Sequence, residues 1–464
     1  MYVIIFLLGY FLGKYKKFSI KLYQIYQIFE NVLSYFFFND GDYISDERDR
    51  STFVEVRKII KKYLIIADDF TGANDTGVQL AKRGLETHVV LDGKNIQDNT
   101  ISYVLDTESR NLEEEQAYKL LKNHLKGIFD KSYDLVYKKV DSTLRGNIAL
   151  EVKAVEEEYA PELILFAPAF PSLGRITIDG IHFVNGIRIM ESEFAKDPKK
   201  PVLEDHIQRI LQPVFDEGVI HHSLDEIREN KIEFVKGRIH SFDVQTNEDL
   251  KRMIIAASNT NKKILWVGSA GMADMILQIH KPLKPVLSVV GSLSEVSRKQ
   301  VKYAESKGVR VLKVDIGDLL QGENREKYVD NSVKIMEEGK DLIITSSYDV
   351  EDYSRAIKVG RQLSMNKEEV GNFTKDIMGE IGKCIVERVD NIPGVFITGG
   401  DTAIGFIYKT KALGSCIIDE IITGIPLMKL KGGDFDGFKM VTKAGAFGTE
   451  EDLFYSIEKL KEEK

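Results

Sequence analysis

From Tyr63 onward, short apolar runs alternate with longer stretches in which charged and apolar residues are mixed. The runs are rich in Val, Ile and Leu, which is typical of strands that are buried on both faces of a parallel sheet, and the longer stretches are typical of helices. Strands are expected at 63–67, 87–91, 102–106, 135–139, 162–167, 263–267, 286–290, 309–314, 341–346 and 394–399. This alternation predicts an α/β fold with mostly parallel sheets.

The expected strands fall into two groups on either side of "HKPLKP" at 280–285. This segment holds two of the ten prolines and lies between a helical pattern and a strand, which marks a domain boundary. A chain of 464 residues is also long enough for two or three domains. We therefore expect one α/β domain over 61–280 and a second over 285–464.

Residues 1–60 do not follow this pattern, and we expect them to form an N-terminal extension outside the fold. The opening "MYVIIFLLGYFLG" is apolar for thirteen residues, which span about 20 Å as a helix and fall short of a ~30 Å hydrocarbon core. No basic region precedes it and no clear cleavage site follows, so a signal peptide fits poorly. An interfacial membrane anchor within residues 1–40 and a bland extension, including one from a misassigned start, both stay open.

Composition narrows the class of protein. Apolar residues make up 43% and charged residues 29%, which is ordinary for a globular protein, and the net charge of −8 argues against nucleic-acid binding. Because Cys384 and Cys416 are the only cysteines, a disulfide framework and a cysteine-rich zinc site are excluded, and the cytoplasm is the expected compartment. A homodimer is compatible with the sequence, which does not fix the oligomeric state.

In open α/β sheets, ligands bind beyond the carboxyl ends of the strands. In "IADDFTGANDTG", Asp68 and Asp69 directly follow the first expected strand. Thr71 is a plausible cap of the next helix, and Asp75 would lie in its first turn. Since a single acid would be enough for a helix start, the adjacent pair favours a substrate site. A transition-metal site is disfavoured because no His or Cys partner is near in sequence.

A second polar cluster, "KKVDSTLRGN" at 138–147, follows another expected strand. An arginine can fork onto a carboxylate or phosphate, and aspartate and serine can bind sugar hydroxyls. The candidates are Lys139, Asp141, Ser142, Thr143 and Arg145. A capped helix start with a surface arginine is the alternative.

A third cluster, "APAFPSLGRITIDGIHFVNG" at 167–186, is expected to be a long, shaped loop. Arg175 and His182 could reach a pocket from it. A structured loop without a ligand role is the competing interpretation.

The second half of the chain carries glycine-centred turns at strand ends, "VVGSLS" at 289–294 and "FITGGDTAIG" at 396–405. Flexible glycine turns are also expected at 429–437 and 442–448. Small residues allow backbone N–H groups to approach an anion at a helix N-terminus, so the set favours nucleotide phosphates. The chain contains no GxxxxGK[ST] and no GxGxxG, so neither a P-loop nor a dinucleotide fingerprint is supported.

Taken together, these motifs resemble those of the four-carbon acid sugar kinase family. The motifs occur in the family's order and cover about 63–455; they are "IADDFTGANDTGVQLAKRG", "KKVDSTLRGN", "APAFPSLGRITIDGIHFVNG", "VVGSLS", "TGGDTA" and "GIPLMKLKGGDFDGFKMVTKAGAFG". The "DTGVQ" form of the first motif is most similar to the D-threonate kinase branch. The first sixty residues have no counterpart in the family pattern.

The resemblance implies a sugar-acid substrate-binding domain over 61–280, a nucleotide-binding domain over 285–464, and an active site in the cleft between them. It implies transfer of a phosphoryl group from ATP, with Mg²⁺, to the 4-hydroxyl of a four-carbon sugar acid. The implied substrate side is Asp68, Asp69, Thr71, Asp75, Lys139, Asp141, Ser142 and Arg145. The implied ATP side is Ser292, Ser294, Gly399, Gly400, Asp401, Thr402 and Gly445.

Under this interpretation, Arg145 holds the substrate carboxylate and an aspartate accepts the proton from the attacking hydroxyl. Asp69 is preferred as this base, and Asp141 and Asp401 are its rivals. The sequence does not say which carboxylate would contact Mg²⁺. D-Threonate is the preferred substrate, with D-erythronate and 3-oxo-tetronate as alternatives. A kinase for another small sugar acid, an aldonate-related lyase and a non-catalytic sugar-acid sensor are the competing functions.

Overall fold

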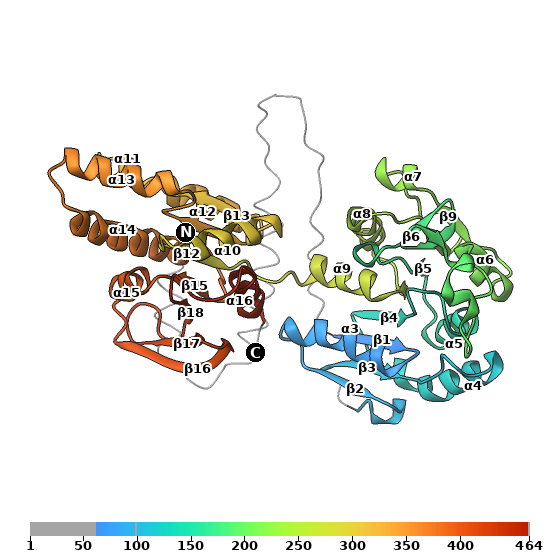
Figure 1. Ribbon diagram of the computed structural model, residues 1–464. Coiled ribbons are helices and arrows are strands. Elements are labelled where there is room, and N and C mark those ends of the chain that lie inside the picture. Colours follow the sequence, from blue (N-terminus) through green and yellow to red (C-terminus); the bar gives the residue numbers. More distant parts are fainter. Residues whose placement is uncertain (1–61, 98–99, 463–464) are drawn as a thin grey trace, which may run out of the picture. The chain divides into compact units, whose positions relative to one another are not determined.

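The computed structural model describes residues 62–97 and 100–462 (Figure 1). The predicted extension over residues 1–60, with its candidate membrane anchor, lies outside these ranges. Among the described residues, none of the helices combines the length and apolar character needed to cross a membrane.

The first sheet has eight strands in the order β2-β3-β1-β4-β11-β5-β10-β9, and all of its pairings are parallel. Its strands are β1 (Tyr63–Ala67), β2 (Thr87–Val90), β3 (Ser102–Asp106), β4 (Leu135–Lys139), β5 (Leu163–Ala167), β9 (Ile220–His222), β10 (Ile239–Phe242) and β11 (Ile264–Gly268). Helices α3 (Phe70–Lys82), α8 (Asn247–Ser258) and α9 (Ala270–His280) pack on one face, and α4 (Glu114–Leu125) and α5 (Ile148–Tyr159) on the other. Two short helices, α6 (Ile207–Leu211) and α7 (Leu224–Arg228), complete this part.

Alternation along the strands explains the two packed faces. Leu64 and Ile66 of β1 belong to one buried cluster, while Tyr63, Ile65 and Ala67 belong to the other. All five side chains are buried, as expected for a strand covered by helices on both sides.

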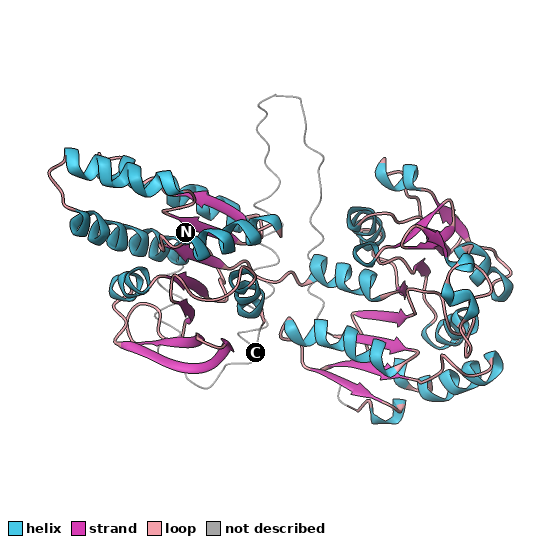
Figure 2. Ribbon diagram, viewed as in Figure 1, coloured by secondary structure: helices cyan, strands magenta, loops and turns pink. Residues whose placement is uncertain are grey.

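The second sheet has seven strands in the order β13-β14-β12-β15-β18-β17-β16. Pairing is parallel from β13 to β18 and antiparallel for β17 and β16. The strands are β12 (Leu287–Val290), β13 (Arg310–Lys313), β14 (Leu342–Thr345), β15 (Val395–Thr398), β16 (Gly414–Ile422), β17 (Ile425–Lys431) and β18 (Lys439–Lys443). The fold class is therefore the predicted one, with two α/β domains and mostly parallel sheets (Figure 2).

Helices again cover both faces of this sheet. On one side lie α11 (Ile316–Leu320), α12 (Glu326–Glu337), α13 (Val350–Gln362), α14 (Lys367–Arg388) and α15 (Gly400–Lys409), and on the other α10 (Glu295–Ser306) and α16 (Asp452–Lys461).

The prediction of a long loop over 167–186 is wrong for its second half, which forms the first two strands of a three-stranded antiparallel sheet. Ile178 pairs with Ile181, so the first turn consists of Asp179 and Gly180, both with positive φ (51° and 74°). A two-residue hairpin turn of type I′ requires positive φ at both positions, and Asp-Gly supplies it. Asn-Gly forms the second turn in the same way. The strands are β6 (Arg175–Ile178), β7 (Ile181–Val184) and β8 (Ile187–Arg188).

Candidate functional site

The two adjacent aspartates lie at the carboxyl end of β1, where the chain turns into α3. Asp68 is buried, with 2% of its surface exposed, and Asp69 is partly exposed. Asp69 is the N-cap of α3, and its Oδ1 accepts a hydrogen bond from the Gly72 N–H at 3.2 Å. The expectation that Thr71 caps this helix is therefore wrong, because the helix already begins at Phe70. Asp75 is exposed and lies beyond the first turn, contrary to expectation.

Arg110 holds both aspartates at once. Its Nε and Nη2 donate to Asp68 at 2.7 and 3.0 Å, and its Nη1 and Nη2 donate to Asp69 at 2.9 and 2.6 Å. One guanidinium thus makes two bidentate contacts with neighbouring carboxylates. Arg110 is not among the residues predicted from the sequence. Its position four residues after the end of β3, which pairs directly with β1, was the available signal.

Charge and burial shift the pKa values of this cluster. Burial raises the pKa of Asp69, with the charge of Asp68 adding to the rise and Arg110 opposing it. Although burial opposes a charged guanidinium, the hydrogen bonds and charge of Asp68 leave the pKa of Arg110 above its ordinary value. The raised pKa makes Asp69 readier to take up a proton than an ordinary aspartate.

Lys139 and Asp141 come from the carboxyl end of β4, the strand next to β1. Both are buried, with 5% and 8% of their surfaces exposed. Burial lowers the pKa of Lys139, although the charges of Asp68 and Asp141 oppose this change. For Asp141, burial is outweighed by Arg110 and Arg145, so its pKa is lowered. The first domain therefore gathers cations and carboxylates from two neighbouring strand ends.

Arg145 is paired with carboxylates of the chain itself. Its Nε donates to Asp141 Oδ2 at 2.6 Å, and its Nη1 donates to Asp197 Oδ2 at 3.2 Å. The guanidinium also lies over the ring of Phe194, 5.6 Å from its centre. From the sequence, Arg145 was predicted to bind the substrate carboxylate. Its contact with Asp197, which is 52 residues away, was not predicted.

His182 ties the small antiparallel sheet to the second polar cluster. The ring is fully buried between the Thr177 hydroxyl, 3.0 Å from Nδ1, and the Ser142 carbonyl oxygen, 2.8 Å from Nε2. Burial lowers the pKa of His182 to about 4, so the ring is neutral at pH 7. This geometry supports a structural role for His182. Arg175 likewise donates to a backbone oxygen, that of Leu173.

In the second domain, the ends of β12 and β15 border a cavity of about 350 Å³. A Cβ at Gly291 would lie 1.9 Å from Thr402 Oγ1, so glycine is required for the two turns to approach this closely. Five of the residues predicted on the ATP side line the cavity: Ser292, Gly399, Gly400, Asp401 and Thr402.

The other two residues predicted on the ATP side, Ser294 and Gly445, do not line the cavity. Ser294 is the N-cap of α10, and its hydroxyl donates to the Gly445 carbonyl oxygen at 2.6 Å. The loop at 444–447, expected to be flexible, is held by Lys443. Its Nζ donates to the carbonyl oxygens of Ala444, Gly445 and Phe447 at 2.7, 3.1 and 2.8 Å. Burial lowers the pKa of Lys443 to about 8.

The remaining wall of this cavity was missed by sequence analysis, because it comes from helices without glycine motifs. Ile316, Ala356 and Val370 supply an apolar surface, and Tyr353, Thr374 and Lys375 supply polar groups. Ser346, after β14, is buried and lines the same cavity, and its hydroxyl has no hydrogen-bond partner among the described residues.

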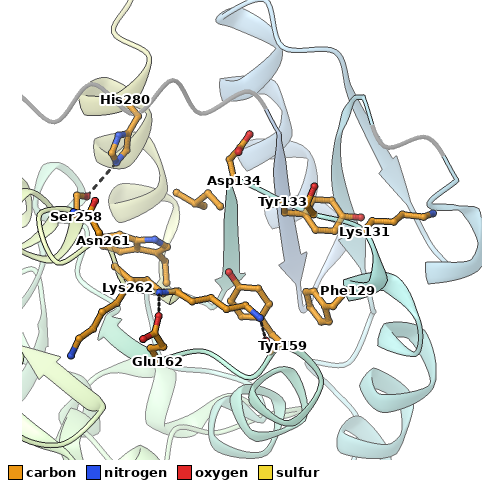
Figure 3. A pocket seen from close by; sticks show the side chains of 15 residues that line it. Phe129, Lys131, Tyr133, Asp134, Tyr159, Glu162, Ser258, Asn261, Lys262 and His280 are labelled. Carbon is orange, nitrogen blue, oxygen red and sulfur yellow. Dashed lines mark hydrogen bonds between the residues drawn. The ribbon is translucent and has the colours of Figure 1, made fainter. Parts of the chain in front are cut away.

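A second cavity, of about 500 Å³, lies at the amino ends of β4 and β11, the opposite edge of the first sheet from Asp68 (Figure 3). Tyr133, Tyr159 and Trp266 line it, and Lys263 lies over the Tyr159 ring at 4.2 Å. None of the predicted site residues belongs to it.

Comparisons with known proteins found two family models that match this chain. Family models described as a sugar-binding N-terminal domain and a nucleotide-binding C-terminal domain match residues 63–276 and 287–453. A D-threonate kinase of Salmonella typhimurium is 32% identical over 420 residues, which cover 86% of this chain and 99% of that protein. A D-erythronate kinase of Heliobacterium modesticaldum is 26% identical, with 84% and 94% covered.

A solved structure from Bordetella bronchiseptica is also similar, with 25% identity and a TM-score of 0.56 over 86% of this chain and 98% of that one. It is described as a domain-swapped dimer with bound citrate.

A sugar-binding and a nucleotide-binding α/β domain in one chain define a small-molecule kinase. The chain belongs to the four-carbon acid sugar kinase family. It is an enzyme, a phosphotransferase that acts on a hydroxyl group.

Proposed function

We propose that this protein phosphorylates the 4-hydroxyl of a four-carbon sugar acid with ATP, and that D-threonate is the preferred acid. The observation that carries the proposal is the Asp68–Asp69–Arg110 cluster at the carboxyl edge of a sheet that matches a sugar-binding domain. Carboxylates held in fixed orientation can accept hydrogen bonds from several hydroxyls of a small polyol. The 32% identity to a D-threonate kinase supports the choice of acid.

Asp69 is the proposed general base. It is more exposed than Asp68, and its raised pKa brings it closer to the operating pH, which favours proton transfer. Asp141 is a weaker candidate because, although burial opposes the change, Arg110 and Arg145 lower its pKa, which moves it away from the operating pH. Asp401, exposed at the nucleotide cavity, remains a rival. The other proposed substrate contacts are Thr71, Asp75, Lys139, Ser142 and Arg145.

ATP is proposed to bind in the cavity of the second domain. The start of α15 presents backbone N–H groups at the Gly399–Thr402 turn, a favourable site for phosphates. Ile316, Ala356 and Val370 provide an apolar surface for the base. Asp401 has the oxygen chemistry that Mg²⁺ prefers, and it would hold the ion together with phosphate oxygens and water. Bound Mg²⁺ would neutralise developing phosphate charge.

The test is ATP consumption by the purified chain with D-threonate, D-erythronate, L-threonate and 3-oxo-tetronates. The highest kcat/KM is expected for D-threonate. A preference for D-erythronate or a 3-oxo-tetronate would support the proposed kinase activity but would identify a different substrate. Turnover of an acid without ADP formation would indicate a lyase, and binding without turnover would indicate a sensor. Absence of activity on every four-carbon acid would refute the proposal.

We also propose a homodimer, on the basis of the dimer described for the Bordetella bronchiseptica relative. Light scattering of the purified chain should give about twice the 52.6 kDa of one chain. A mass of one chain at micromolar concentration would contradict it.

A further inference from the structure

Two consecutive lysines of β4 point to opposite faces of the first sheet. Lys139 belongs to the candidate substrate site, whereas Lys138 points away from it and is fully buried. The Lys138 Nζ lies 2.8 Å from Oε2 of Glu151, on α5, and the Glu151 carboxylate is also buried, with 1% of its side chain exposed. The pair therefore lies in the core, beneath the sheet edge that carries the substrate-site residues.

The second carboxylate oxygen of Glu151 links this pair to the site. Glu151 Oε1 accepts a hydrogen bond from the Ser109 hydroxyl at 2.7 Å, and Ser109 directly precedes Arg110. Arg110 in turn donates to both Asp68 and Asp69. A continuous chain of contacts thus runs from the buried ion pair to the two aspartates.

The loop that carries Arg110 is also anchored through backbone groups at and after Ser109. The Arg110 N–H donates to the Asp68 carbonyl oxygen at 3.1 Å. Asn147, just before α5, donates from Nδ2 to the carbonyl oxygens of Ser109 and Leu112, both at 3.0 Å. Backbone contacts therefore fix the course of the loop, while the Ser109 hydroxyl bond adds a side-chain constraint next to Arg110.

Stability alone explains the buried pair poorly. Removing two charges from water costs several kcal/mol per ion, and apolar replacements of such pairs are often neutral or stabilising. We propose that Glu151 is a positioning residue, which orients Arg110 through Ser109, and that Lys138 balances the charge of the buried carboxylate. This inference rests on the proposed function of the Asp68–Asp69–Arg110 cluster.

Two double variants test separately the role of Glu151 as hydrogen-bond acceptor for Ser109 and the role of its charge. Lys138→Met/Glu151→Gln removes both charges and keeps an acceptor for Ser109, so kcat for the sugar acid should stay within about threefold of wild type. Lys138→Met/Glu151→Leu removes the acceptor as well, and kcat should fall roughly tenfold to a hundredfold. A purely structural ion pair would give equal effects in the two variants, and that result would overturn the proposal.

Ser109→Ala tests the same link and keeps both members of the ion pair, should either double variant fail to fold. Its kcat should fall at least about tenfold while KM for ATP stays within about twofold. Ser288→Ala is the matched control, because Ser288 is fully buried and its hydroxyl has no hydrogen-bond partner within the described part of the chain. A Ser109→Ala variant with wild-type kcat would contradict the inference.

A crystal structure of Ser109→Ala measures the orientation of Arg110 independently of turnover. We expect loss of the bidentate contact with Asp68, and retention of all four Arg110 contacts would overturn the inference. Failure of the wild-type chain to phosphorylate any acid would instead refute the proposed function, so the two failures are distinguishable.

Discussion

At the scale of single residues, the account depends on one arginine that organises two carboxylates. Arg110 makes four hydrogen bonds to Asp68 and Asp69, all between 2.6 and 3.0 Å. Adjacent carboxylates repel one another, and a shared guanidinium removes that cost while fixing their directions. Gly146 adds to this arrangement, because a Cβ there would lie 3.2 Å from Asp68 Oδ2.

Arg110→Lys should therefore lower kcat/KM for the sugar acid about a hundredfold, because a lysine cannot make two bidentate contacts. KM for ATP should change little. The measurement is steady-state kinetics with the acid and ATP varied separately. Arg188→Lys is the matched control, since Arg188 makes a bidentate pair with Asp205 far from β1 in sequence. Equal effects of the two substitutions would contradict a specific role for Arg110.

The protonation state of Asp69 predicts the pH profile. A general base must be ionised, so the rate falls as pH falls through its pKa, and burial raises the pKa of Asp69. The acid limb of kcat/KM should thus lie above the ordinary aspartate value of about 3.9. Asp69→Asn should abolish turnover and leave ATP binding intact. Near-normal turnover of this variant would show that Asp69 is not the general base and would leave Asp141 and Asp401 as the candidates.

Part of the site could be predicted from the sequence, because several of its residues lie at the ends of predicted strands. Four of its residues lie at the end of a predicted strand or within two residues of that end, so the rule for α/β sheets placed them at one edge: Asp68, Asp69, Lys139 and Asp141. Arg110 follows its strand at a distance, and Asp197 lies in no motif at all. Their contacts depend on tertiary packing, which a linear pattern does not encode.

At the scale of elements, prediction succeeded for the buried strands β1, β3 and β4, which each contain at least three consecutive apolar residues, and it missed strands with other patterns. β1, β3 and β4 have the predicted bounds. β10 is fully buried, but its sequence is "IHSF". Because His240 and Ser241 interrupt the apolar residues, a search for apolar runs does not find this strand. The antiparallel β16 is mostly exposed, and its pattern resembles that of a surface loop.

The close approach of two turns in the second domain gives an element-scale prediction. Gly291→Ala would place a methyl group 1.9 Å from Thr402 Oγ1 and push the β12 and β15 turns apart. KM for ATP should rise at least about tenfold, with a lower melting temperature. Gly414→Ala is the control, because no heavy atom of the described residues, apart from its own chain neighbours, lies within 4 Å of its added Cβ. An unchanged KM for ATP in Gly291→Ala would show that this turn does not contribute to nucleotide binding.

At the scale of the whole molecule, the family matches begin at residue 63 and end at residue 453. A chain that starts at Val54 should therefore keep kcat and both KM values within about twofold of the full-length chain. Parallel kinetics and circular dichroism of the two chains test this expectation. A folded but inactive shorter chain would show that the first residues contribute to catalysis.

Transfer of the ATP γ-phosphoryl to the 4-hydroxyl of D-threonate is the central claim, and NMR of the reaction product tests it most directly. A mixture of the chain, ATP, Mg²⁺ and D-threonate should yield ADP and one phosphomonoester in equal amounts, with the phosphorus coupled to the two C4 protons. A phosphate on C2 or C3, or ADP without a phosphorylated acid, would contradict the account.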